Sequence, residues 1–214
     1  MSQRDVVHAL LDRAGSTYAA ESGIKLDDKP APLFQLLMMS ELLSARISAD
    51  IATAATAELV HSGYRTAREV ADAQWQELVD ALGRGHYRRY DERTASQLGE
   101  IAATVLEKYG GDLRKLADEA DHDPDRAAEL IQQFKGIGPT GGDIFLREVQ
   151  NVWPWVRPHF DRRAVHGAQR IDLPADPGKL ARLAPDHEAA EFAAALVRVA
   201  VDDDLAAYVR SATH

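Results

Sequence analysis

The sequence of 214 residues contains no cysteine. Disulfides, thiolate zinc sites, cysteine nucleophiles and cysteine-ligated iron–sulfur clusters are therefore all excluded. The longest uninterrupted apolar run, residues 192–197, is far shorter than the roughly 20 residues that a transmembrane helix needs. The first residues also lack the apolar stretch of a signal peptide. From these absences we expect a cytoplasmic protein.

Positive charge is scarce but concentrated. The net charge of −9 does not favour a polyanionic partner, because phosphate binding depends on basic surface. Two short stretches are nevertheless basic, with four arginines in residues 84–93 and four in residues 157–170. Arginine also outnumbers lysine by 19 to 6, and a guanidinium group can make two parallel hydrogen bonds to one phosphate. This distribution is compatible with DNA binding without establishing it.

Apolar residues recur with a helical period along nearly the whole sequence, which predicts an all-α protein without strands or internal repeats. The segment 33–43 is apolar on all sides, as is typical of a buried helix. Glycines and prolines between the periodic segments mark their ends. The expected helices cover residues 6–20, 33–43, 49–61, 66–82, 94–109, 124–134, 180–184, 189–201 and 205–211.

One turn has the chemistry of a phosphate-binding site. A helix ends, Gly136-Ile137-Gly138 reverses the chain, and Pro139 begins a second helix at the position that proline prefers. The unpaired amides in the first turn of the second helix point toward the turn, where they favour an anion. A helical hairpin without a ligand has the same pattern, so the turn alone leaves both interpretations open.

A carboxylate follows downstream at Asp161, directly before a segment with helical apolar spacing. The ordinary role of an aspartate at this position is to cap the helix. Its functional role would be a carboxylate held at the mouth of a cleft beside Arg162 and Arg163. Both roles remain open on the sequence alone.

The sequence resembles the helix-hairpin-helix DNA glycosylases, most closely endonuclease III, in three segments that share their order and spacing: Leu42-Leu43-Ser44-Ala45-Arg46, the hairpin at 134–142, and Phe160-Asp161-Arg162-Arg163. The similarity covers roughly residues 32–170. It implies a protein of DNA base-excision repair that binds double-stranded DNA containing a damaged base or an abasic site.

The resemblance also implies a fold of two helical lobes with DNA across the cleft between them. Residues 27–150 would form a six-helix lobe that contains the hairpin. Residues 1–26 and 151–214 would together form the second lobe, which carries Asp161. A monomer is expected.

Two departures from the family pattern limit the expected activity. Members that also cut the DNA strand carry a lysine in the second helix of the hairpin. The amine of this lysine forms a Schiff base with the sugar. Thr140 occupies the matching position here. Lys135 lies five positions earlier and is not equivalent. The iron–sulfur cluster of endonuclease III is excluded, which leaves a monovalent cation at the hairpin as the one cofactor that the resemblance allows.

Two further families share parts of the pattern. The alkylpurine glycosylases have a similar Gly-Ile-Gly-Pro turn and likewise keep the aspartate without the lysine. The adenine glycosylases use a glutamate in the early buried helix. Ser40 occupies that position here, and Glu41 lies one residue beyond it, about 100° around the helix. That catalytic role is therefore not transferred to Glu41.

The resemblance assigns Asp161 to stabilising the positive charge that develops at the sugar C1′ and to positioning water, with Thr140 lining the site. Arg46 matches the position at which endonuclease III inserts a glutamine into the gap left by the extruded base. The expected DNA-binding residues are Arg46, Lys135, Gly136, Ile137, Gly138, Arg162 and Arg163.

These residues predict a monofunctional DNA glycosylase, a hydrolase that flips a damaged base out of the stack and cleaves its N-glycosidic bond without lyase activity. Two alternatives remain. The protein could be a DNA-damage-binding protein that has lost catalysis, or an abasic-site lyase that uses a lysine not equivalent to the family's. The presence of Asp161 favours an enzyme. Such a protein would be associated with the nucleoid.

Overall fold

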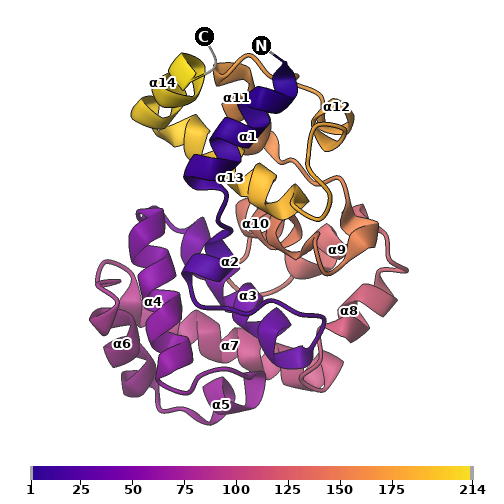
Figure 1. Ribbon diagram of the computed structural model, residues 1–214. Helices are drawn as coiled ribbons and strands as arrows, with labels where there is room; N and C mark the ends of the chain where they lie inside the picture. The colour runs from indigo at the N-terminus through magenta and orange to yellow at the C-terminus, as the bar shows by residue number, and fades with distance from the viewer. Residues whose placement is uncertain (1, 213–214) are drawn as a thin grey trace. The chain divides into compact units, whose positions relative to one another are not determined.

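The computed structural model describes residues 2–212, which form fourteen α-helices and one 3-10 helix and contain no strand (Figure 1). The expected all-α fold is confirmed. None of these helices combines the length and the apolar character needed to cross a membrane. The chain divides into two compact units, of which one comprises the residues up to Tyr18 together with those from Arg147 onward, and the other comprises Ala19–Leu146. The functional lobes expected from the resemblance stay a prediction.

In the unit of residues 19–146, α3 (Pro30–Ser44) and α7 (Asp91–Tyr109) form the centre. Every residue of α3 from Leu33 to Leu42 is buried, as the apolar residues on all sides of this helix predict. Further helices pack around these two or extend the unit: α4 (Ala49–His61), α5 (Ala67–Asp72), α6 (Trp75–Arg84), α8 (Arg114–Glu119), α9 (Pro124–Ile131) and the start of α10 (Pro139–Val149).

The segment 66–82, expected as one helix, is two. Thr66 and Glu69 form a capping box that starts α5, with the Glu69 carboxylate accepting the Thr66 amide at 2.8 Å. The Glu77 carboxylate accepts the Gln74 amide at 3.0 Å and starts α6 in the same way. Because the apolar spacing continues across this second start, periodicity alone could not reveal the break.

The segment 6–20, also expected as one helix, is likewise divided. The first part is α1 (Gln3–Ala14), which ends at Gly15, whose amide donates to the Leu11 carbonyl at 2.8 Å. A short helix, α2 (Tyr18–Glu21), follows.

The other unit is organised around α13 (Ala189–Val201), which packs against α1, α11 (Arg162–Arg170) and α14 (Asp203–Ala212) (Figure 1). Gly167 lets α11 approach α13 closely, since a methyl group at this position would overlap the Leu196 carbonyl oxygen. The remaining short elements are the 3-10 helix η1 (Pro154–Val156) and α12 (Pro177–Ala181).

Candidate functional site

The turn between α9 and α10 has the backbone that the sequence predicts. Gly136 has a φ of +82°, in the left-handed region that favours glycine. Pro139 is the first residue of α10, and the Gly142 amide donates to the Gly138 carbonyl at 3.0 Å. The first amides of a helix have no hydrogen-bond acceptor within that helix. The amides before Gly142 in this turn can therefore donate to an anion.

One residue of the turn faces inward. The Ile137 side chain is buried, and its amide donates to the Phe134 carbonyl at 3.1 Å. A phosphate at this turn would therefore meet the amides of the neighbouring residues. The carbonyl oxygens of Phe134 and Gly138 accept one amide each. A carbonyl oxygen has two lone pairs, so these groups could also hold the monovalent cation that the resemblance allows.

The glycines of the hairpin allow it to lie directly on α3 and α7. A methyl group at Gly136 would lie 2.8 Å from Cδ of Gln97 and 3.1 Å from Oε1 of Glu41. At Gly141 it would lie 2.8 Å from Cγ2 of Ile137, also within the hairpin. Larger residues at either glycine would push the turn away from its support.

Glu41 is an acidic residue inside the wholly buried part of α3, with 3% of its surface exposed. Burial raises its pKa to about 8, although the nearby Arg93 acts in the opposite direction. Within residues 2–212, neither Oε2 of Glu41 nor Oε1 of Gln97 accepts a hydrogen bond. Glu41 is therefore largely protonated at neutral pH, and its carboxyl group then carries a donor of the kind that Oε1 of Gln97 lacks.

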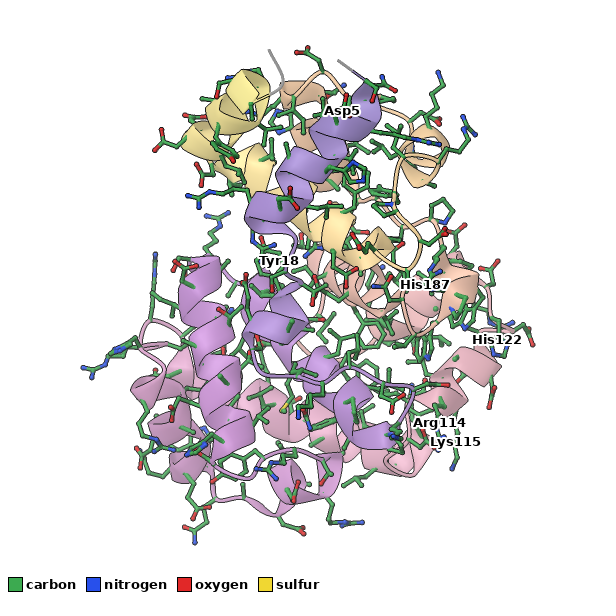
Figure 2. The ribbon with its side chains drawn as sticks, in the orientation of Figure 1. Asp5, Tyr18, Arg114, Lys115, His122 and His187 are labelled. Carbon is green, nitrogen blue, oxygen red and sulfur yellow. The ribbon has the colours of Figure 1, made fainter. Side chains whose placement is uncertain are left out.

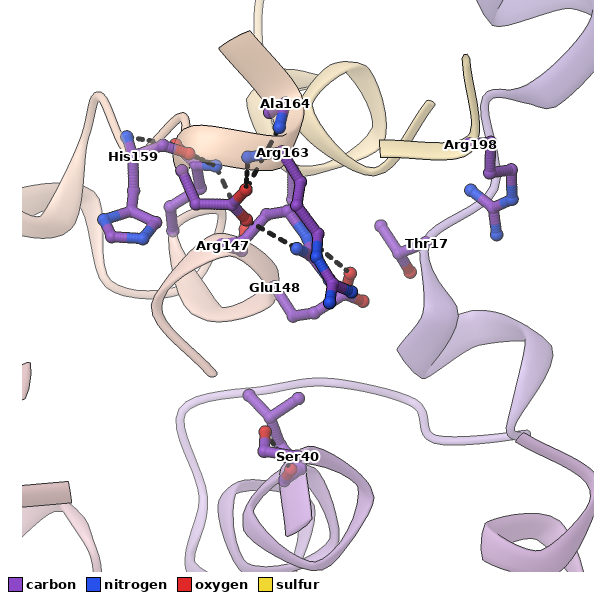
Figure 3. A network of polar contacts seen from close by, with 12 residues as sticks. Thr17, Ser40, Arg147, Glu148, His159, Arg163, Ala164 and Arg198 are labelled. Carbon is purple, nitrogen blue, oxygen red and sulfur yellow. Dashed lines mark hydrogen bonds and ion pairs between the residues drawn. The ribbon is translucent and has the colours of Figure 1, made fainter. Parts of the chain in front are cut away.

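Asp161 is the N-cap of α11, as one of its two expected roles requires, and Figure 3 labels its hydrogen-bond partners Arg147, Arg163 and Ala164. Its Oδ1 accepts the amides of Arg163 at 2.8 Å and Ala164 at 3.0 Å. Its Oδ2 accepts Nη1 of Arg147 at 2.6 Å. Both side chains are buried, with 4% of Asp161 and 3% of Arg147 exposed.

The electrostatics of this pair keep Asp161 ionised. Burial alone would raise the pKa of the carboxyl group, but the Arg147 guanidinium and the two amides outweigh it and hold the pKa below its usual value. Arg147 is itself held between this carboxylate, Glu148 at 3.6 Å and the ring of Tyr18, 5.5 Å from its centroid. Asp161 is therefore a fixed, buried anion at the N-terminus of α11.

Sequence reasoning missed Arg147. The available signal was an arginine within the predominantly apolar carboxyl-terminal half of α10, where a charge must find a partner. Fourteen positions separate it from Asp161, and no periodicity connects residues at that distance.

The other expected site residues lie on the surface. Arg46 directly follows α3, is exposed, and forms no ion pair with another residue of the described range 2–212. Thr140 is exposed in the first turn of α10. Lys135 is 62% exposed with Nζ 4.0 Å from Oε2 of Glu100. Arg46, Thr140 and the hairpin belong to the unit of residues 19–146. Asp161 belongs to the other unit, together with the exposed residues Arg162 and Arg163.

No protein-family model and no curated protein matches this sequence. Two solved structures are similar to it in three dimensions. One is a trapped covalent intermediate of endonuclease III with DNA, an estranged-adenine complex, at 15% sequence identity, and the other is a non-covalent endonuclease III–DNA complex at 17%. Each has a TM-score of 0.50, and each match covers 92% of this chain and 86% of the other.

The chain has the endonuclease III fold. This result confirms the all-α, endonuclease III-like fold that the resemblance implied. At such low identity the likeness shows the fold alone. The activity of this chain depends on the residues of the site.

Proposed function

We propose that this chain is a monofunctional DNA glycosylase that hydrolyses the N-glycosidic bond of a flipped, damaged base in double-stranded DNA. The observation that carries the proposal is the Asp161 carboxylate, which is held in place and ionised by Arg147 and two backbone amides in a chain with the endonuclease III fold.

Cleavage of the bond between sugar and base passes through a state with positive charge at C1′. A nearby anion stabilises that charge most effectively when its position is fixed before the reaction, because no reorganisation is then needed. Asp161 has these properties. In the proposed reaction it stabilises the cation and positions the attacking water, and the water supplies the hydroxyl group that replaces the base.

The proposal expects no cleavage of the strand. Thr140 stands where the resemblance places the lysine of bifunctional members, and a hydroxyl group cannot form a Schiff base with C1′. DNA would be held through the amides around Gly136 and Gly138 and by the exposed side chains of Lys135, Arg46, Arg162 and Arg163.

One observation favours the second candidate, a protein that binds damaged DNA without catalysis. The Arg147 guanidinium lies 2.6 Å from Asp161 and compensates much of the negative charge that a cationic transition state would use. In this candidate the aspartate is a structural cap and ion-pair partner only.

Base release from a panel of duplexes with single lesions, followed by alkali cleavage at abasic sites, separates the candidates. The proposal expects release of at least one base, an intact strand before alkali, and no adduct after borohydride, which traps only a Schiff base. Asp161→Asn, which still caps a helix, should abolish release while retaining DNA binding. Asp161→Asn removes the nearer of the two carboxylates beside Arg147, so the melting temperature of the variant is measured alongside.

Two results would reject the proposal. Release of no base from the whole panel, together with binding to abasic-site duplex, would identify the binding protein. A borohydride adduct that disappears in Lys135→Ala would identify a lyase with a non-equivalent lysine.

A further inference from the structure

An exposed basic cluster lies around Tyr90, at the start of α7, and the proposed site does not use it. Its members are Arg88, Arg89, Tyr90 and Arg93, named here the Tyr90 cluster. The guanidinium carbons of Arg89 and Arg93 each lie 5.2 Å from the centroid of the Tyr90 ring. Both are within the range of a cation–π interaction.

The three arginines of the cluster are available to a partner. None of them forms an ion pair with another residue of the described part of the chain, residues 2–212. Arg84, a few residues earlier, is by contrast bound to Glu58 at 3.2 Å. The adjacent Asp91 is engaged locally, since its Oδ1 accepts the Glu92 amide at 2.9 Å in the first turn of α7, where acidic residues are favoured.

The cluster continues the surface that supports the hairpin. Arg93 and Gln97 are four residues apart on α7 and therefore share a face. Gln97 lies against Gly136 of the hairpin, and Arg93 is close enough to Glu41 to act on it electrostatically. A helix rises about 1.5 Å per residue, so Arg93 is only about 6 Å along the axis from Gln97. The cluster thus begins within one helical turn of the hairpin, in the same unit.

We propose that the Tyr90 cluster binds backbone phosphates of DNA next to the phosphate that the hairpin binds. In this proposal the Tyr90 ring positions Arg89 and Arg93. The proposal rests on the DNA-binding function proposed above. Successive phosphates of one strand advance by about 3.4 Å along the duplex axis, so a strand held at the hairpin continues within reach of long side chains one helical turn away. Guanidinium groups recognise phosphate oxygens through paired hydrogen bonds.

Tyr90 gives the cluster its preorganisation. A free arginine side chain loses rotamer freedom when it binds a phosphate, and this loss weakens the binding. Guanidinium groups already held against a ring have lost part of that freedom. The ring itself supplies this contact, so the phenolic hydroxyl group is not required.

The arginines are tested by the salt dependence of duplex affinity. Arg89→Gln and Arg93→Gln should each reduce the magnitude of the slope of log K against log salt by about 0.9, the value for one phosphate contact. Arg114→Gln is the matched control, because Arg114 lies exposed on α8 and is bound to Asp112 at 2.7 Å (Figure 2). All three variants change the net charge equally, so a general charge effect would appear in the control too.

Tyr90 is tested with two substitutions. Tyr90→Phe keeps the aromatic ring and should bind duplex as the wild type does. Tyr90→Leu should weaken binding a few-fold with an unchanged salt slope, because the arginines remain but are no longer held. Equal binding by Tyr90→Leu and Tyr90→Phe would overturn the positioning role.

The inference and the proposed function fail differently. In the first case the wild type binds duplex, a Gly136→Val hairpin variant does not, and Arg89→Gln and Arg93→Gln keep the wild-type salt slope. The Tyr90 cluster then does not bind phosphate, and the inference is wrong. If the wild type binds no duplex even at low salt, the proposed function is wrong, and the inference that rests on it falls as well.

Discussion

Glu41 couples the stability of the fold to pH through one buried proton. In the unfolded chain its carboxyl group titrates near the usual value of 4.5, whereas burial in α3 raises the pKa to about 8. The folded state therefore binds more protons than the unfolded state between these two values. Stability contributed by the neutral form is complete below about pH 4.5 and is lost as the pH rises toward 8.

Glu41→Gln tests this coupling. The wild type should lose up to about 1.4 kcal/mol of unfolding free energy per pH unit between pH 5 and 8 from this group, and the variant should lack that slope. Urea unfolding across this range gives both slopes. Glu100→Gln is the control, because Glu100 also lies on a helix of the same unit, α7, but has 57% of its side chain exposed. Parallel pH profiles for the wild type and Glu41→Gln would show that Glu41 is not protonated in the fold.

The residues that sequence reasoning located are those whose role is local. The cap at Asp161 follows from one carboxylate before one helix, and the hairpin follows from consecutive glycines and a proline. The environments of Arg147 and Glu41 follow from packing, because each is ionisable and is buried by parts of the chain far away in sequence. A sequence shows that such a charge needs compensation, but only the fold shows what provides it.

Elements were predicted best where composition alone determines their environment. The apolar sequence of α3 predicts complete burial, and the structure buries every residue from Leu33 to Leu42. The break between α5 and α6 was missed because the Glu77 carboxylate, which accepts the Gln74 amide, starts a new helix within an apolar period that continues across it. A capping interaction contributes about 1 kcal/mol and leaves no trace in the apolar spacing.

At the scale of helices, Gly167 and Gly99 should respond oppositely to alanine. Gly167→Ala would place a methyl group against the Leu196 carbonyl oxygen and force α11 away from α13, at a cost of about 1–3 kcal/mol or more. Gly99 lies inside α7 with open space at its Cβ position, so Gly99→Ala should stabilise by up to about 1 kcal/mol through helix propensity. Unfolding in urea measures both, and a loss of stability in Gly99→Ala as large as that in Gly167→Ala would contradict this account of the packing.

For the molecule as a whole, charge distribution matters more than net charge. The chain carries a net charge of −9, yet three exposed arginines at the start of α7, Arg88, Arg89 and Arg93, form no ion pair within the described residues 2–212. Binding of a polyanion depends on such local positive potential, and the resulting affinity falls as salt is added.

Arg46 should distinguish recognition of damage from general attraction to DNA. It is exposed directly after α3 and forms no ion pair within residues 2–212, so its substitution should not disturb the fold. If it enters the space left by a flipped base, Arg46→Ala should lose about 1 kcal/mol, or roughly fivefold in affinity, on lesion-containing duplex. Undamaged duplex offers no such space, so the loss there should be limited to the weaker effect of removing one surface charge. Fluorescence anisotropy with matched duplexes measures the two losses, with Arg114→Ala as the control for charge. Equal losses on both duplexes would show that Arg46 contributes general electrostatic attraction and does not insert.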